Sequence, residues 1–182
     1  MSAATARVLT VSVLALLAAS GWSHSVAATS HEVAGGGPVT VGYPYAFECP
    51  AAGIAKRVDR WDMFMCNCTS YVAWALQANR QRIDWFVRGA MDARNWPNVA
   101  RRAGLRIVPT PAVGEVAVWP AIGKPFGHVA YVTAVAGNGR FVVGEYNFPS
   151  SGGLTRFVFD LRTTVVTRGV TFIAVPRIAS EP

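Results

Sequence analysis

The chain has 182 residues, of which 52% are hydrophobic and 15% are charged, and its 17 lysines and arginines outnumber its 10 aspartates and glutamates. This composition excludes a disordered chain, and the length excludes a large multidomain protein. The 17 glycines and 11 prolines are scattered without a period, which excludes a collagen-like chain and leaves a turn-rich domain.

The first 28 residues have the pattern of a secretory signal peptide. Arg7 is the only charge before an apolar run over residues 8–19, and small residues follow at Val26-Ala27-Ala28. A membrane anchor is the alternative, but it needs about 20 apolar residues, and polar side chains interrupt this run from Ser20 onward. We therefore expect export with cleavage, to a secreted or periplasmic location, without stable membrane insertion.

Residues 29–42 are expected to form a flexible leader. They include the Gly35-Gly36-Gly37-Pro38 segment, whose composition is typical of a flexible joint. The remaining residues, 43–182, are of the size of one ordinary domain with its own core.

Two helices are predicted in the first half of this domain. Over Asn67–Ala78, apolar side chains recur at the spacing of an amphipathic helix, and Asn67 is a favourable N-cap. A second helix is predicted over Ala90–Ala103, with Gly104 as its end. Because proline is tolerated in a first turn but not inside a helix, the second helix can be broken at Trp96-Pro97.

Short strands rich in Val, Phe and Tyr are predicted after Gly104. These strands are Val116–Trp119, His128–Val135, Arg140–Asn147, Leu154–Leu161 and Val170–Val175. The Ala136-Gly137-Asn138-Gly139 segment is a strong hairpin signal between the second and third strands. Helices followed by an antiparallel meander predict an α+β domain in which the helices pack on one face of the sheet.

The chain contains three cysteines, at positions 49, 66 and 68. An odd count in an exported protein predicts one disulfide and one free thiol, or an intermolecular bridge. A zinc site is the alternative, with Cys49, Cys66, Cys68 and His128 as the four ligands. The Cys-x-Cys spacing differs from that of structural zinc knuckles, so we expect no metal.

Cys68 is the candidate nucleophile because it is the first helical residue after the Asn67 cap. At that position its sulfur lies at the positive end of the helix dipole, which favours the thiolate. Cys66 lies outside the helix and lacks this advantage. A small buried hydrophobe is the alternative role for a lone cysteine, so the interpretation depends on the other residues of the site.

His128 begins a predicted strand and is the candidate base, although a lone strand histidine is more often a core residue. Pairing Val135 with Arg140 sets the register of the hairpin. His128 then faces Asn147 directly and Glu145 diagonally, whereas a one-residue slip would put them on opposite faces. A carboxylate or amide beside an imidazole fixes its tautomer and orientation, as in a Cys-His-acid arrangement.

Four short segments carry the strongest functional signal. They are Cys68-Thr69-Ser70-Tyr71-Val72-Ala73-Trp74, Pro111-Ala112-Val113-Gly114-Glu115-Val116-Ala117-Val118-Trp119, Gly127-His128-Val129 and Glu145-Tyr146-Asn147. In order and spacing the chain resembles the CHAP domains (cysteine, histidine-dependent amidohydrolases/peptidases) of bacterial cell-wall hydrolases. Each segment alone is a weak signal, but four in order are a strong one.

The resemblance implies a fold, an activity and roles for four residues. The fold is papain-like, with a helix that carries the cysteine packed on an antiparallel sheet that carries the histidine. Cys68 is then the nucleophile, His128 the general base and Glu145 the orienting carboxylate, and Asn147 is a nearby polar helper. The implied substrate is peptidoglycan, cut at the muramoyl-L-alanine link or at a peptide bond of the stem or cross-bridge, without a metal or organic cofactor.

The cysteine pairing follows from the implied role of Cys68. If that sulfur must remain free for catalysis, Cys49 and Cys66 are the pair that forms the disulfide. The bridge closes a loop of about 16 residues and stabilises the fold by roughly 3 kcal/mol in the chain-entropy model.

The expected mature domain is basic. Because Arg7 leaves with the signal, the net charge falls from +7 to +6, which suits anionic envelope polymers as further partners. Seven arginines lie between Arg80 and Arg106, and a solvated helical face explains them equally well. Nucleic acid is not expected as a partner, because export takes the protein away from nucleic acid and the sequence contains no groove-reading motif.

Two alternative functions are considered beside peptidoglycan hydrolysis. One is a non-catalytic envelope-binding module that keeps the cleft, and the other is an amidase that acts on an amide outside the wall. The presence of Cys68, His128 and Glu145 together argues against the binding module, because binding alone requires no such set.

Overall fold

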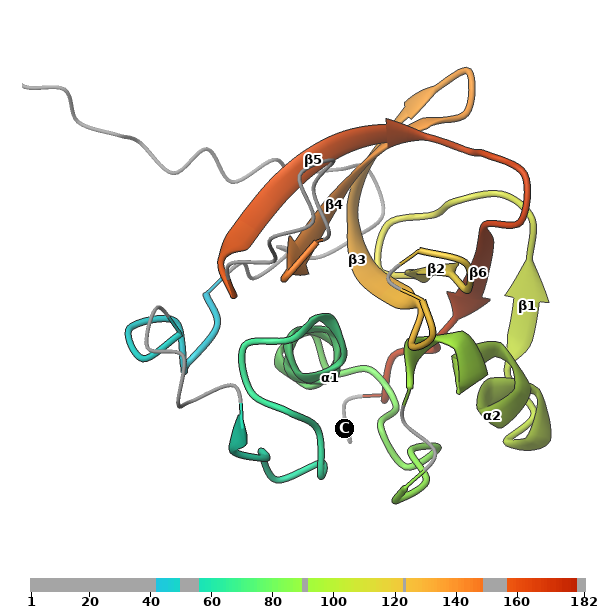
Figure 1. Cartoon of the computed structure of the whole chain (residues 1–182). Coiled ribbons are helices and arrows are strands. Elements are labelled where there is room, and N and C mark those ends of the chain that lie inside the picture. The colour runs from blue at the N-terminus through green and yellow to red at the C-terminus, as the bar shows by residue number, and fades with distance from the viewer. Residues whose placement is uncertain (1–41, 50–55, 90–91, 123, 149–156, 180–182) are drawn as a thin grey trace, which may run out of the picture.

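The computed structural model of the chain describes residues 42–49, 56–89, 92–122, 124–148 and 157–179. The predicted signal peptide and the leader, except residue 42, lie outside the described residues. Figure 1 shows the chain passing from N-terminal turns through the helices into a curved sheet. No helix within the described ranges is long and apolar enough to cross a bilayer.

Six strands form one sheet in the order β1-β6-β2-β3-β4-β5, and all neighbours are antiparallel. The strands are β1 (Arg106–Val108), β2 (Val116–Trp119), β3 (His128–Gly137), β4 (Arg140–Tyr146), β5 (Phe159–Val165) and β6 (Thr171–Ala174). The four strands from β2 to β5 form the predicted meander. The last strand departs from that pattern, because β6 returns to lie between β1 and β2.

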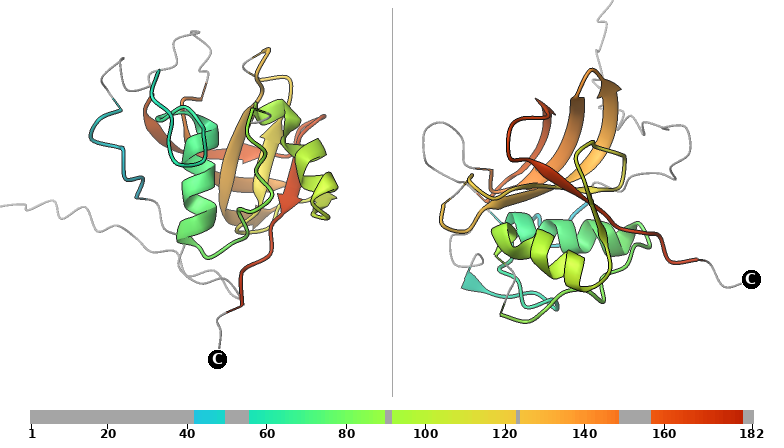
Figure 2. Two further views of the ribbon diagram at one scale, coloured as in Figure 1. Left: turned by 90° about the horizontal axis from the view of Figure 1, so that it is seen from below. Right: turned by 90° about the vertical axis from the view of Figure 1, so that its right-hand side faces the viewer.

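The helices cover one face of the sheet, which confirms the predicted α+β class (Figure 2). α1 spans Cys68–Ala78 and packs mainly against β3 and β4. The predicted second helix is shorter than expected, because a 3-10 turn over Ala93–Asn95 precedes α2 (Trp96–Arg102). Pro97 lies in the first turn of α2, where its missing N–H removes no helical hydrogen bond.

The two faces of the sheet carry separate apolar clusters. One cluster, which includes Val129 and Tyr131, packs against the helices and the N-terminal segment. The other, which includes Ala130 and Val132, lies on the opposite face of the curved sheet. Because side chains alternate along a strand, His128 projects from this second face, at the end of β3 that lies near the start of α1.

Two strand predictions need correction. β1 was not predicted, because three residues with only two apolar side chains give no clear alternation. The strand predicted over Leu154–Leu161 is β5, which begins at Phe159 and continues to Val165; residues 154–156 lie outside the described part. The β-branched run after Leu161 favours this longer strand.

The β3–β4 hairpin has the predicted register only in the part toward His128 and Glu145, away from its tip. At the tip Gly137 pairs with Arg140, so the predicted pairing of Val135 with Arg140 is wrong. Two register shifts below the tip each absorb one residue. From the pair Val132↔Val143 onward, the pairing equals the predicted one, and it places the start of β3 beside the end of β4.

Tyr71 joins α1 to the sheet through a close contact with Gly144 of β4. The Tyr71 ring is fully buried among the rings of Tyr43, Tyr146 and Phe159. A Cβ atom at position 144 would lie 2.5 Å from the Tyr71 hydroxyl oxygen, and that hydroxyl has no hydrogen-bond partner among the described residues. Glycine at this position therefore allows α1 to approach the strand that carries Glu145.

We expect Gly144→Ala to lower the free energy of unfolding by about 1–3 kcal/mol, because the tightly packed Tyr71 ring cannot move away. Tyr71→Phe alone should be neutral or stabilising, since it removes a buried hydroxyl without a partner. In the Tyr71→Phe background, Gly144→Ala should cost clearly less. Denaturant unfolding of the four proteins measures this coupling, and an equal cost in both backgrounds would contradict the contact.

Candidate active site

Cys68 is the first residue of α1 and is the free cysteine of the described part, with its side chain half-buried. Burial alone would raise the pKa of the Cys68 thiol. The positive charge of His128 and its hydrogen bond outweigh burial, and backbone N–H groups of Val129 and Thr69 add to their effect. The pKa of the thiol is therefore lowered, which favours the thiolate.

His128 and Glu145 form a buried pair between β3 and β4. His128 Nε2 lies 2.8 Å from Glu145 Oε2, and the two side chains are 2% and 0% exposed. Because Nε2 faces Glu145, Nδ1 is the ring nitrogen that remains for the interaction with Cys68. Burial lowers the pKa of His128, but the charges and hydrogen bonds of Cys68 and Glu145 raise it to about 9.

Arg162 of β5 contacts the same carboxylate. Its Nε donates to Glu145 Oε1 and its Nη2 donates to Oε2 at 3.0 Å. Burial raises the pKa of the Glu145 carboxyl, but the hydrogen bonds and positive charges of His128 and Arg162 outweigh it and lower the pKa. The carboxylate is therefore ionised, with a cation on each side.

Two aromatic rings enclose the imidazole. The Trp119 ring centroid lies 6.0 Å from that of His128, and the Phe148 ring meets His128 edge-on at 5.2 Å. Both rings also contact Arg162, whose guanidinium carbon is 5.2 Å from the Trp119 centroid and 3.9 Å from that of Phe148. These rings exclude water from the His128–Glu145 pair, which strengthens its electrostatic interactions.

The side chains of Asn147 and Asn67 are hydrogen-bonded to each other. Asn147 lies just past β4 with a φ of 56°, and its Nδ2 donates to Asn67 Oδ1 at 2.6 Å. Asn67 makes no side-chain cap hydrogen bond to α1, because its oxygen accepts from Asn147 and its Nδ2 donates to the Met65 carbonyl. The pair of amides thus ties the end of β4 to the residue before Cys68.

A disulfide lies just before Cys68 in the chain. The structure joins Cys49 to Cys66 and leaves Cys68 free. The backbone N–H of the buried Cys66 donates to the Tyr43 hydroxyl at 3.1 Å, and this hydroxyl also contacts Ser70 of α1 at 2.5 Å. The N-terminal segment is therefore fastened to the start of α1 by one covalent bond and two hydrogen bonds.

The geometry does not support the zinc alternative. Two of its four proposed ligands, Cys49 and Cys66, are bonded to each other. No group of three or more metal-ligating side chains is gathered anywhere within the described ranges.

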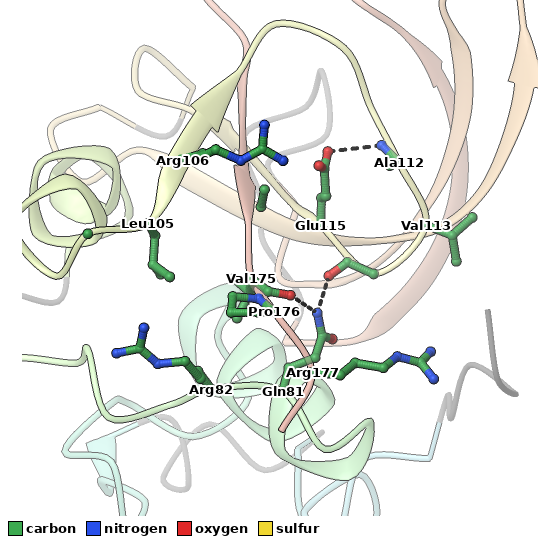
Figure 3. Close-up of a pocket in the computed structure, with 13 residues that line it drawn as sticks. Gln81, Arg82, Leu105, Arg106, Ala112, Val113, Glu115, Val175, Pro176 and Arg177 are labelled. Carbon is green, nitrogen blue, oxygen red and sulfur yellow. Dashed lines mark hydrogen bonds between the residues drawn. The ribbon is translucent and has the colours of Figure 1, made fainter. Parts of the chain in front are cut away.

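A separate pocket of about 420 Å³ lies beyond the C-terminal end of α1 and the N-terminal end of β2 (Figure 3). Cys68 and His128 lie at the other ends of α1 and of the β2–β3 pair. Gln81 is part of its wall, and its Nε2 donates to the carbonyls of Gly114 and Val175. Arg82, Arg106 and Arg177 also line the pocket. None of the four candidate site residues does, so this cavity is distinct from the candidate active site.

Comparison with known proteins identifies the family. Residues 58–147 match the CHAP domain model, and this stretch contains Cys68, His128 and Glu145. The chain therefore contains a CHAP domain, as the resemblance indicated.

Individual relatives match over part of their length. The chain is 42% identical over 66 residues to the N-acetylmuramoyl-L-alanine amidase sle1 of Staphylococcus haemolyticus, which covers 36% of this chain and 20% of the relative. It is 40% identical over 63 residues to the staphylococcal secretory antigen ssaA2 of Staphylococcus aureus, covering 35% of this chain and 23% of the relative. The chain thus spans less than a quarter of these curated relatives.

A solved structure supports the fold. The crystal structure of an N-acetylmuramoyl-L-alanine amidase from Staphylococcus aureus superposes with a TM-score of 0.50 at 25% sequence identity. The match covers 60% of this chain and 30% of that one.

Arg162 is the residue of the site that the sequence analysis missed. The strand predicted there ended at Leu161, so Arg162 fell outside any predicted element. The β-branched residues from Thr163 to Val166 were the signal that could have extended the strand and placed Arg162 on the face of Val143, its partner in β4.

The disulfide leads to a prediction for the exported protein. Peptide mapping after alkylation without reductant should find one label, on Cys68, and one linked peptide that joins Cys49 to Cys66. Cys49→Ser should release the loop and lower the free energy of unfolding by roughly 3 kcal/mol. Labels on all three cysteines, or a bridge to Cys68, would contradict this pairing.

Proposed function

We propose that this protein is a peptidoglycan hydrolase that cleaves an amide bond with a Cys68–His128–Glu145 thiol mechanism. The observation that carries the proposal is a half-buried thiol at a helix start beside a buried imidazole, which in turn bonds a buried carboxylate. These residues lie within the stretch that matches the CHAP domain model. The amidase relatives support the substrate class.

The reaction begins with attack of the Cys68 thiolate on the amide carbonyl carbon. A C–S bond forms, and the tetrahedral oxyanion is stabilised by N–H groups at the start of α1, including that of Cys68. The C–N bond then breaks as the His128 imidazolium gives its proton to the leaving amine. Water next attacks the thioester while His128 takes its proton, which releases a carboxylate and restores the thiolate.

Glu145 and Asn147 act on the geometry and not on the substrate. Glu145 fixes the tautomer of His128, so that Nδ1 faces the thiolate, and it stabilises the imidazolium. Asn147 holds Asn67 and thereby the approach of the chain to Cys68. Asn147 is therefore a positioning residue in this proposal.

The bond that is cut is either the muramoyl-L-alanine link or a peptide bond of the stem or cross-bridge. Incubating the mature protein with purified peptidoglycan and identifying new termini by mass spectrometry distinguishes these bonds. New amino termini on L-alanine indicate the first, and new termini within the peptides indicate the second. Unchanged peptidoglycan, under conditions where Cys68 is reactive, would overturn the proposal.

Export to the envelope fits this substrate. The N-terminal pattern of residues 1–28 and the Cys49–Cys66 bridge both support an oxidising location outside the cytoplasm. The positive net charge supports anionic envelope polymers as further partners.

Cys68→Ala and His128→Ala should each lower peptidoglycan hydrolysis by roughly 1000-fold or more while the domain stays folded, because the nucleophile and base act as one unit. Glu145→Gln should cause a smaller loss, since an amide can still orient the imidazole. Asp160→Asn is the matched control, because Asp160 is the exposed β5 partner of Glu145 and should leave the rate unchanged. Wild-type turnover by the Cys68→Ala protein would exclude the mechanism.

The rate should follow a bell-shaped pH profile. The active form combines the Cys68 thiolate with the His128 imidazolium, so activity rises as pH passes the lowered pKa of the thiol. It falls as pH rises through the pKa of His128, raised to about 9, because the imidazolium is then lost. Initial rates on a soluble muropeptide across this range test the profile, and a rate that climbs steadily into alkali would argue for an ordinary thiol.

A further inference from the structure

We propose that Arg162 is a positioning residue of the active site, which keeps Glu145 ionised and oriented toward His128 and thereby stabilises the Cys68 thiolate through these two intervening side chains. This inference rests on the proposed thiol mechanism. It adds a fourth member to the set, one supplied by β5, a strand that contributes none of the other three.

The carboxylate of Glu145 is fully engaged by its two partners. Arg162 Nε donates to Oε1, while Oε2 accepts from Arg162 Nη2 at 3.0 Å and from His128 Nε2 at 2.8 Å. A two-pronged guanidinium contact fixes the plane of a carboxylate, which a single hydrogen bond cannot do. The plane of Glu145 then determines where Oε2 meets the imidazole.

Arg162 is itself held in place. Its side chain is 21% exposed, and its guanidinium lies against the rings of Trp119 and Phe148, the same rings that enclose His128. A guanidinium over aromatic rings makes this contact better than a lysine ammonium does. The side chain is thus fixed before any substrate binds.

The charges of the site alternate in sign. A Cys68 thiolate, a His128 imidazolium, a Glu145 carboxylate and an Arg162 guanidinium form a line whose sum is zero. Without the guanidinium, a buried site would hold one net negative charge, and desolvation would favour the uptake of a proton by Glu145. The imidazolium then loses its buried anionic partner and stabilises the thiolate less.

Tyr71 and Asp160 are further titratable groups near Glu145 in the described part of the chain. From α1, Tyr71 lies near Glu145 and stays neutral, because burial raises its pKa. On β5, Asp160 is the strand partner of Glu145 and is exposed. Neither supplies a positive charge, so Arg162 is the cation that balances Glu145 on the side away from His128.

The test is the pH dependence of Cys68 alkylation by iodoacetamide in the mature protein without reductant, followed by mass spectrometry. This readout needs no substrate, so it is independent of whether peptidoglycan is cleaved. For Arg162→Gln, the acid limb of the rate should move to higher pH by about one pH unit, because loss of a cation raises the pKa of the thiol. Arg162→Lys keeps the charge and should move the limb less.

Arg140→Gln is the matched control, since Arg140 is an exposed arginine at the far end of β4. It removes the same charge and should leave the limb in place. An unmoved limb in a folded Arg162→Gln protein would overturn the proposal. An equal movement in Arg140→Gln would also overturn it, because the effect would then follow net charge alone.

A second comparison decides the matter if the Arg162→Gln protein does not fold. In the Glu145→Gln background, Arg162 has no carboxylate to hold, so adding Arg162→Gln should leave the acid limb where Glu145→Gln alone puts it. A further movement of the limb would show that Arg162 acts directly on Cys68 or His128, and would overturn the positioning role.

Discussion

A buried imidazolium is stable only when a buried carboxylate lies beside it, and the arrangement around His128 follows from this constraint. The register of β3 and β4 must bring Glu145 to Nε2, and α1 must begin where its thiol lies beside the imidazole. β5 must extend far enough to pair Arg162 with Glu145. Three separate parts of the fold are thus positioned around one line of charges.

The parts of the site that depend on local pattern could be predicted from the sequence. The start of α1 follows from helical periodicity, and the shared face of His128 and Glu145 follows from strand alternation. The hairpin tip was predicted incorrectly, but two register shifts restored the expected pairing before the site. His128 and Glu145 therefore lie on the same face, as predicted, only because two irregularities in the hairpin compensate for the wrong pairing at its tip. No short-range sequence pattern indicates these irregularities.

The remaining features depend on partners that are distant in the chain. Asn147 adopts a positive φ after β4, and its side chain meets Asn67, 80 residues earlier. The position of β6 between β1 and β2 cannot be predicted from the residue pattern of the strands, because that pattern does not specify which strands are neighbours. Arg162 reached the site only because β5 runs past Leu161. Local propensity sets the elements, but tertiary contacts set their ends and partners.

The disulfide beside the nucleophile has a consequence for the cell that makes the protein. The bridge between Cys49 and Cys66 fastens the segment that leads into Cys68, and it can form only in oxidising surroundings. Under the proposed export, a newly made chain in a reducing cytoplasm lacks this fastening. The segment that leads into Cys68 is then covalently held in place only after the chain has left the compartment of its synthesis.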